Sequence, residues 1–252
     1  MSFAVAAEAY DAFMGRWSRR LAVPFADFAA ADPPARLLDV GCGTGALSEE
    51  LRRRRLDARL VAVDPSTSFA ASVSGRLSGI GIAIAAAEQL PFPDAVFDAA
   101  LAQLVVHFMA DPVLGLAEMR RVTRPGGTVG ACVWDYGGER GPLGVFWESA
   151  RAVDPDAPGE SHLPGTSEGQ LEHLLRAAGL REVEAAELIV AIEHPTFEDW
   201  WAPFTRGAGP AGSYVASLDQ DGRERVMAEC RRRLPMRPIV VNAVAWAARG
   251  SV

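Results

Sequence analysis

The chain has 252 residues, of which 49% are hydrophobic and 23% are charged, and this composition is typical of a folded globular protein rather than a disordered one. Its formal net charge of −7 disfavours a nucleic-acid partner, because binding to phosphates needs a clustered basic surface. The lysine-free sequence also excludes catalysis by a lysine base or a lysine Schiff base.

Cysteine usage and the N-terminal sequence indicate where the protein works. Cys42, Cys132 and Cys230 lie far apart without a Cys-x-x-Cys pair, so we expect neither a disulfide framework nor a zinc site. The N-terminus lacks a basic segment followed by an apolar core, and no apolar stretch reaches the length of a membrane span. We therefore expect a cytoplasmic protein without a membrane partner, and the bias toward alanine and arginine favours a GC-rich bacterial genome.

The order of predicted elements indicates an α/β fold. Residues 3–28 carry apolar positions at helical spacing, which predicts one or two helices that precede a sheet and cap the site. Beyond them, apolar strands alternate with helical segments, as in a parallel sheet. The predicted strands span residues 36–40, 60–64, 83–87, 97–102, 128–135, 184–194 and 239–248.

The most informative local pattern is a glycine-rich turn after the first predicted strand. Gly41, Gly43 and Gly45 lie between this strand and a predicted helix over residues 46–56. Glycine permits positive φ and lets a ligand approach the backbone, so we expect a cofactor loop. Because Gly41, Gly43 and Ala46 also satisfy the dinucleotide fingerprint, an NAD-dependent oxidoreductase stays open at this point.

Asp64 ends the second predicted strand, about twenty residues beyond the glycine turn, where a carboxylate can accept hydrogen bonds from both ribose hydroxyls. The alternative is an N-cap, because Asp64-Pro65-Ser66 also begins a predicted helix. In the ribose interpretation, Pro65 and Ser66 flank the adenine edge.

The second half of the chain predicts a covered site. Residues 111–122 begin with Asp-Pro and predict a helix. The glycine- and proline-rich residues 136–166 predict a mobile loop over the site, with a helix near residues 143–152. A further helix is predicted over residues 170–178.

An inserted stretch, residues 195–238, precedes the last predicted strand and is rich in aromatic residues. These rings either form the hydrophobic base of a small helical cap or line a substrate site. They are Phe197, Trp200, Trp201, Phe204 and Tyr214.

Three motifs carry a family resemblance. The sequence Asp-Val-Gly-Cys-Gly-Thr-Gly at residues 39–45 resembles the first motif of class I S-adenosylmethionine-dependent methyltransferases. Residues 90–98 resemble the second motif of the small-molecule methyltransferases related to ubiquinone and menaquinone biosynthesis. Residues 121–127 resemble the turn of that family into its fifth strand. The resemblance covers residues 10–135 well, and it argues against NAD.

The resemblance implies a fold and a domain organisation. The expected fold is a Rossmann-like, doubly wound, seven-stranded sheet, mostly parallel with an antiparallel last strand. We expect a single methyltransferase domain over residues 1–252. Its expected parts are an N-terminal helical cap (1–31), a cofactor-binding core (35–135) and an inserted helical substrate cap (195–238).

It also implies which residues hold S-adenosylmethionine. Ala86 stands where the family has an aspartate that holds adenine, which leaves the Ala87 backbone amide and Glu88 for that contact. The Gln103 backbone is expected beneath the methionine portion, with Tyr10 and Arg16 closing over the carboxylate. The full set is Tyr10, Arg16, Gly41, Cys42, Gly43, Asp64, Pro65, Ser66, Ala87, Glu88 and Gln103.

Methyl transfer requires alignment and exclusion of water, and it needs no metal. His107 is the first candidate general base and Asp135, at the end of a predicted strand, is the second. The alternative for His107 is a packed core residue. The acceptor is expected to be a small molecule, apolar or aromatic in keeping with the aromatic insertion. A methyltransferase-fold protein that binds the cofactor without methyl transfer is the remaining alternative.

Overall fold

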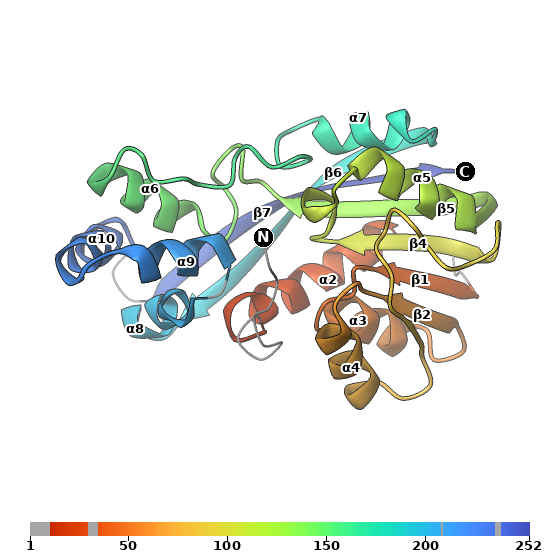
Figure 1. Ribbon diagram of the computed structural model, residues 1–252, viewed down its shortest axis with the longest axis horizontal. Helices are drawn as coiled ribbons and strands as arrows, with labels where there is room; N and C mark the ends of the chain where they lie inside the picture. The colour runs from red at the N-terminus through yellow and green to blue at the C-terminus, as the bar shows by residue number, and fades with distance from the viewer. Residues whose placement is uncertain (1–10, 30–34, 208, 235–237) are drawn as a thin grey trace.

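The computed structural model describes residues 11–29, 35–207, 209–234 and 238–252. Its centre is one seven-stranded sheet with the order β3-β2-β1-β4-β5-β7-β6 (Figure 1). Only β7 runs antiparallel to its neighbours, β5 and β6, which confirms the predicted fold class. The strands are β1 (Arg36–Val40), β2 (Arg59–Val63), β3 (Gly81–Ala83), β4 (Phe97–Gln103), β5 (Thr123–Trp134), β6 (Arg181–His194) and β7 (Ile239–Ser251).

Two strand predictions were wrong in position. The strand predicted over residues 83–87 is the short edge strand β3, which ends at Ala83, and the chain then turns through a hydrogen bond from the Gln89 N–H to the Ala86 carbonyl. Strand β5 begins earlier than predicted, because Thr123 already pairs with Phe97. Residues 124–127, which form the end of the turn predicted over residues 121–127, bulge out of this strand before pairing resumes.

Helices cover both faces of the sheet because successive strand residues point to opposite sides. Leu37 belongs to the same buried cluster as Leu21 of α2, whereas Leu38 packs in the cluster of Leu116 of α5. In Figure 1, α5 and α7 lie over one face, and α2, α3 and α4 lie over the other. These helices are α2 (Arg16–Ala29, after the π-helical turn η1, Asp11–Gly15), α3 (Ala46–Arg54), α4 (Thr67–Arg76), α5 (Pro112–Val122) and α7 (Gln170–Ala177).

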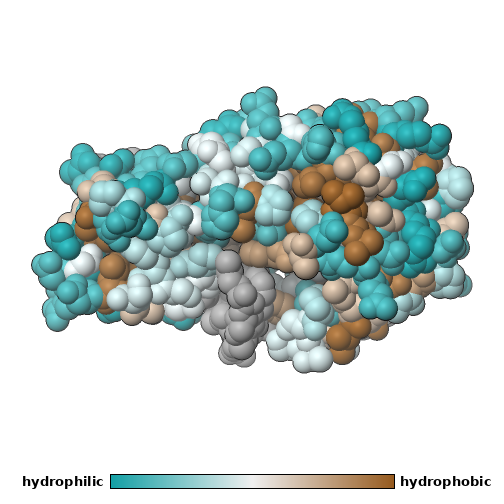
Figure 2. Space-filling view, turned by 45° about the horizontal axis from the view of Figure 1, so that its top comes forward, coloured by the Kyte–Doolittle hydropathy of each residue, from teal (hydrophilic) through white to brown (hydrophobic). Residues whose placement is uncertain are grey.

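A helical half extends from the ends of β6 and β7. Its aromatic residues face inward: Phe204 stacks on Phe146 with ring centroids 4.5 Å apart, and Trp200 and Trp201 are buried. The face shown in Figure 2 is accordingly largely hydrophilic over this half, whereas hydrophobic residues gather over the half that holds the parallel strands. The helices of this half are α6 (Gly144–Val153), α8 (Phe197–Trp201), η3 (Ala202–Arg206), α9 (Gly209–Ser217) and α10 (Gln220–Arg233).

Candidate functional site

The glycine turn joins β1 to α3 in the conformation that its sequence favours. Gly41, Gly43 and Gly45 have φ values of 67°, 52° and 87°, in the left-handed region that disfavours other residues. A Cβ atom at Gly41 would lie 2.4 Å from the Val105 side chain, whereas a Cβ at Gly43 would meet nothing within 4 Å. Gly41 therefore permits close packing, and Gly43 leaves open space for a ligand.

This open space is part of a cavity of about 340 Å³ at the carboxyl ends of β1, β2 and β4. The strand order reverses between β1 and β4, and such a crevice is where open α/β sheets bind ligands. The residues predicted to hold the cofactor that line this cavity are Gly41, Cys42, Gly43, Asp64, Pro65, Ser66, Ala87, Glu88 and Gln103.

Asp64 is buried at the rim of the glycine turn. Its Oδ2 accepts a hydrogen bond from the Gly43 N–H at 2.9 Å, and its Oδ1 accepts one from the Ser66 N–H at 2.8 Å. Burial raises the pKa of this carboxyl. The N-cap of α4 is Ser66, whose hydroxyl accepts from the Phe69 N–H, so the N-cap alternative for Asp64 does not hold.

Asp39 is a cavity residue to which the sequence analysis gave no role. Its side chain is buried, with 1% exposure, and its Oδ2 accepts a 2.5 Å hydrogen bond from the Ser48 hydroxyl. Burial raises the pKa of Asp39 to about 7, and the proximity of Asp64 adds to this shift. An acidic residue inside an otherwise apolar strand was the sequence signal that could have identified it.

Gln103 and Glu88 organise the opposite wall of the cavity. The Gln103 amide donates from Nε2 to the Ser18 carbonyl at 2.9 Å, while its buried Oε1 has no partner among the described residues. Glu88 accepts the Ala110 N–H at 2.7 Å, so it holds the loop beside Ala87 in place. Gln103 thus lines the cavity while its Oε1 stays buried inside the wall.

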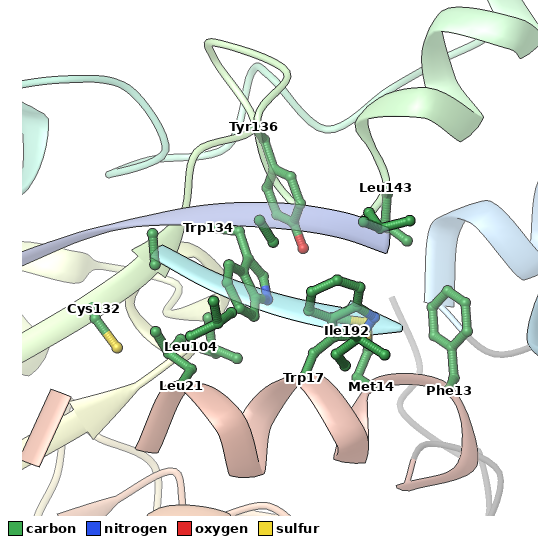
Figure 3. Close-up of a cluster of buried hydrophobic side chains, with 14 of the residues drawn as sticks. Phe13, Met14, Trp17, Leu21, Leu104, Cys132, Trp134, Tyr136, Leu143 and Ile192 are labelled. Atoms are coloured by element: carbon green, nitrogen blue, oxygen red, sulfur yellow. The ribbon is translucent and has the colours of Figure 1, made fainter. Parts of the chain in front are cut away.

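A second cavity of about 640 Å³ adjoins the first. Phe69, Leu104 and Phe108 line both cavities, so these side chains form the wall between them. Four more aromatic residues, Phe13, Trp134, Tyr136 and Tyr214, line this larger, aromatic cavity, and its ionisable groups include His107 and Glu160. Figure 3 shows side chains from the N-terminal helical segment pointing toward Trp134, Tyr136 and Leu143 across this region.

His107 lies in the short 3-10 helix η2 (Val106–Phe108), next to Phe108 of this wall, and lines the larger cavity. Its ring is 4% exposed, and Nδ1 has no partner in the described part of the chain. Burial lowers the pKa of His107 to about 3, so the imidazole is neutral near pH 7. The residue is therefore both buried, as the packing alternative expects, and in contact with a ligand-sized cavity.

The structure does not bring Asp135 or Arg16 to either of these cavities. Asp135 Oδ1 accepts from the Gly138 N–H, and Oδ2 accepts from Arg140 Nε at 2.6 Å, so this carboxylate holds the turn after β5. Arg16 pairs with Asp199 at 2.9 Å. Tyr10 lies outside the described residues.

Among the described residues, no group of three or more histidine, cysteine, aspartate or glutamate side chains could hold a metal ion. Within the same residues, no helix combines the length and the apolar character that a membrane crossing requires.

Comparison with known proteins decides the family. A family described as "Methyltransferase domain" matches residues 38–130. The malonyl-[acyl-carrier protein] O-methyltransferase of Geobacter sulfurreducens is 31% identical over 204 residues, which cover 79% of this chain and 75% of the relative. This chain belongs to the class I S-adenosylmethionine-dependent methyltransferases. The glycine turn is therefore that of a methyltransferase rather than of an NAD-dependent oxidoreductase.

Two further methyltransferases show how far the similarity extends. The malonyl-[acyl-carrier protein] O-methyltransferase of Serratia marcescens is 34% identical, but the match spans only 51% of this chain and 49% of that protein. A solved structure from Anabaena variabilis, described as a methyltransferase of an antibiotic biosynthesis pathway, superposes with a TM-score of 0.64. It is 18% identical and covers 93% of this chain and 100% of its own, so this likeness concerns the methyltransferase fold.

Proposed function

We propose that this methyltransferase transfers the methyl group of S-adenosylmethionine to a small molecule held in the larger, aromatic cavity. The observation that carries the proposal is the shared wall of Phe69, Leu104 and Phe108 between the two cavities. A volume of about 640 Å³ suits a drug-sized molecule with apolar or aromatic surface, because such surfaces bind well against aromatic walls.

The chain's own residues fit the cofactor. Asp64 would accept hydrogen bonds from the ribose hydroxyls, and Gln103, which lines the same cavity, would lie beside the cofactor. The open position at Gly43 leaves room for the cofactor against the backbone. Ala87 and Glu88 would lie beside adenine, because they line the cavity next to Ala86.

When bound, S-adenosylmethionine supplies an electrophilic methyl group on a sulfonium. The aromatic walls would exclude water and orient the acceptor for in-line attack. His107, a neutral imidazole whose residue lines the larger cavity, would accept the proton that the acceptor loses. Asp135, with both carboxylate oxygens engaged, would instead keep the turn after β5 in place.

Titration calorimetry tests the donor site directly. We expect micromolar binding of S-adenosylmethionine and S-adenosylhomocysteine and no binding of NAD. D64A should weaken both interactions by at least roughly 10- to 100-fold, because even one lost hydrogen bond to a charged group is worth about 1.5–3 kcal/mol. The matched control is D57A, which removes an exposed aspartate that pairs with Arg55, two positions earlier. Equal affinity in D64A and D57A would contradict the proposed role of Asp64.

A second candidate function is cofactor binding without methyl transfer, and Ala86 is the observation that favours it. Ala86 lines the smaller cavity beside the glycine turn, which is the proposed donor cavity, and it provides no carboxylate for adenine. Transfer of a labelled methyl group to a panel of small aromatic acceptors distinguishes the two functions. Donor binding with no labelled product across the panel would favour the second one.

We also propose a cytoplasmic location in a bacterium. The buried free thiols of Cys42, Cys132 and Cys230 support a reducing compartment, and the methyltransferases compared above come from bacteria.

A further inference from the structure

Glu160 is a buried carboxyl in the aromatic cavity. It lies in the loop between α6 and α7 and is 5% exposed. Its Oε2 accepts a hydrogen bond from Trp147 Nε1 at 2.8 Å. Of the described residues that line this cavity, Glu160 is the sole acidic one, and none is an arginine.

The environment of Glu160 lacks a compensating positive charge. Within the part of the chain that the structure describes, no cationic side chain forms an ion pair with it, and Arg151, which reaches the adjacent Gly159, pairs with Glu139 instead. Burial raises the pKa of Glu160 to about 7. A carboxyl taken out of water without a cation destabilises the fold, and a cationic ligand would offset that cost.

The aromatic rings that line the same cavity as Glu160 favour the same kind of ligand. Phe13, Trp134, Tyr136 and Tyr214 line the cavity, and the faces of aromatic rings attract organic cations. An anionic acceptor would be disfavoured, because the described lining of the cavity offers it the Glu160 carboxyl and no arginine. A neutral acceptor could hydrogen-bond to Glu160 but would supply no positive charge to stabilise its ionised form.

We propose that Glu160 recognises a positively charged amine on the methyl acceptor, so that the acceptor is an aromatic or apolar amine. This inference rests on the proposed function of the cavity and specifies its substrate class.

The position of Glu160 also indicates which end of the acceptor it holds. Glu160 bonds to Trp147 of α6, which packs against Tyr214 of α9 with ring centroids 5.7 Å apart. The wall shared with the donor cavity is instead formed by Phe69, Leu104 and Phe108. The ammonium group is therefore anchored by the helical half of the protein, and the atom that receives the methyl group lies toward His107. Glu160 acts as a specificity-determining residue and takes no part in the chemical step.

Matched probe sets test the proposal. The protein, saturated with S-adenosylhomocysteine, is titrated with phenolic and indolic compounds in which an ethylamine side chain is replaced by an ethyl group or by an acetate. The sets are tyramine, 4-ethylphenol and 4-hydroxyphenylacetate, and tryptamine, 3-ethylindole and indole-3-acetate. We expect the amine of at least one set to bind roughly tenfold or more tightly than its neutral and anionic counterparts.

Variants assign this preference to the carboxyl. E160Q retains an oxygen for the Trp147 hydrogen bond and should abolish the preference for the amine while leaving the affinity of the neutral probe within about twofold. E160D retains the charge and should keep part of the preference. The control is E168Q, which changes an exposed acid of the same loop and should behave as the wild type.

The outcomes separate this inference from the function on which it rests. If the protein binds S-adenosylhomocysteine but prefers no amine, or if E160Q keeps the preference, the assignment of Glu160 is wrong and the methyltransferase function stands. If S-adenosylhomocysteine itself does not bind, the proposed function fails first. Thermal unfolding of each variant confirms that any loss of binding occurs in folded protein.

Discussion

Thr44 donates a hydrogen bond from its hydroxyl to Asp11 Oδ1 at 3.0 Å, and this contact ties the glycine turn to the segment that precedes α2. Asp11 is fixed in turn by Arg19, whose guanidinium donates to both carboxylate oxygens at 2.9 and 3.1 Å. Arg19 and Thr44 lower the pKa of Asp11 against the effect of burial. The donor cavity is thus braced by a residue that lies 33 positions earlier in the chain.

Removal of the Thr44 hydroxyl should weaken donor binding. We expect T44V to raise the dissociation constant of S-adenosylhomocysteine by roughly 3- to 10-fold, because a hydrogen bond of this kind contributes about 0.5–1.5 kcal/mol. Calorimetry measures the change. The control is T205V, which removes a hydroxyl that bonds locally to the Ala202 carbonyl. Unchanged affinity in T44V would show that the brace does not influence the cofactor loop.

The raised pKa of Asp39 predicts a specific pH dependence of stability. In the unfolded chain an aspartate has a pKa near 3.8, whereas burial raises it to about 7 in the fold. The folded state therefore keeps the Asp39 proton at pH values at which the unfolded chain has lost it. The contribution of Asp39 to the free energy of unfolding is fully present below the unfolded pKa, and it is lost as pH rises through the folded pKa of about 7. D39N, which cannot ionise, should escape this loss.

Denaturant unfolding at about pH 5 and about pH 8 measures the effect. We expect the free energy of unfolding of D39N, relative to wild type, to increase by a few kcal/mol between these pH values, because one pKa unit corresponds to about 1.4 kcal/mol. The difference between the two proteins cancels the contribution of Glu160, whose pKa is raised in the same range. A constant difference would contradict the buried, protonated state of Asp39.

Replacement of His107 should impair the chemical step more than donor binding. With an acceptor found by the labelled-methyl screen, we expect H107Q to lower kcat by roughly 100-fold, within the range of general-base contributions. The affinity for S-adenosylhomocysteine should stay within about twofold, because His107 lines the acceptor cavity. The control is H173Q, which changes an exposed histidine on α7. A wild-type kcat in H107Q would show that His107 is a packing residue and not the general base.

Replacement of Asp135 should affect stability rather than donor binding. D135A removes the acceptor of the Gly138 N–H and of Arg140 Nε, and we expect a loss of about 1–3 kcal/mol in the free energy of unfolding. Chemical denaturation measures the expected loss of stability, and calorimetry with S-adenosylhomocysteine measures the expected unchanged donor binding. If D135A were as stable as wild type but lost methyl transfer, Asp135 would act in catalysis after all.

The sequence was sufficient to predict the sheet and the donor loop because both follow from local patterns. The alternation of strands and helices specifies the parallel sheet, and the glycines at positions 41, 43 and 45 adopt the positive φ angles for which glycine is suited. The strand predicted over residues 83–87 failed because an edge strand has one neighbour, and β3 pairs with β2 over only a few residues. Apolar residues alone do not define where such pairing stops.

The contacts that hold Arg16 and Asp135 away from the two cavities could not be read from local sequence. Arg16 pairs with Asp199, 183 positions away, and Arg140 bridges Asp135 to Glu187 of β6. Neither partner can be recognised without the tertiary fold. Glu160 lies in a stretch that resembles an ordinary polar loop, and only its burial beside Trp147 reveals it.

The two cavities are lined largely by different segments of the chain, and this separation has an evolutionary consequence. The donor cavity draws its lining from residues 18–110, whereas much of the acceptor cavity comes from residues 134–160 and 207–217. Only Phe69, Leu104 and Phe108 of the described residues serve both. In the proposed function, mutations in the later segments change which molecule is methylated while the donor continues to bind, so one ancestral chain could give rise to enzymes that share a cofactor and differ in their acceptors.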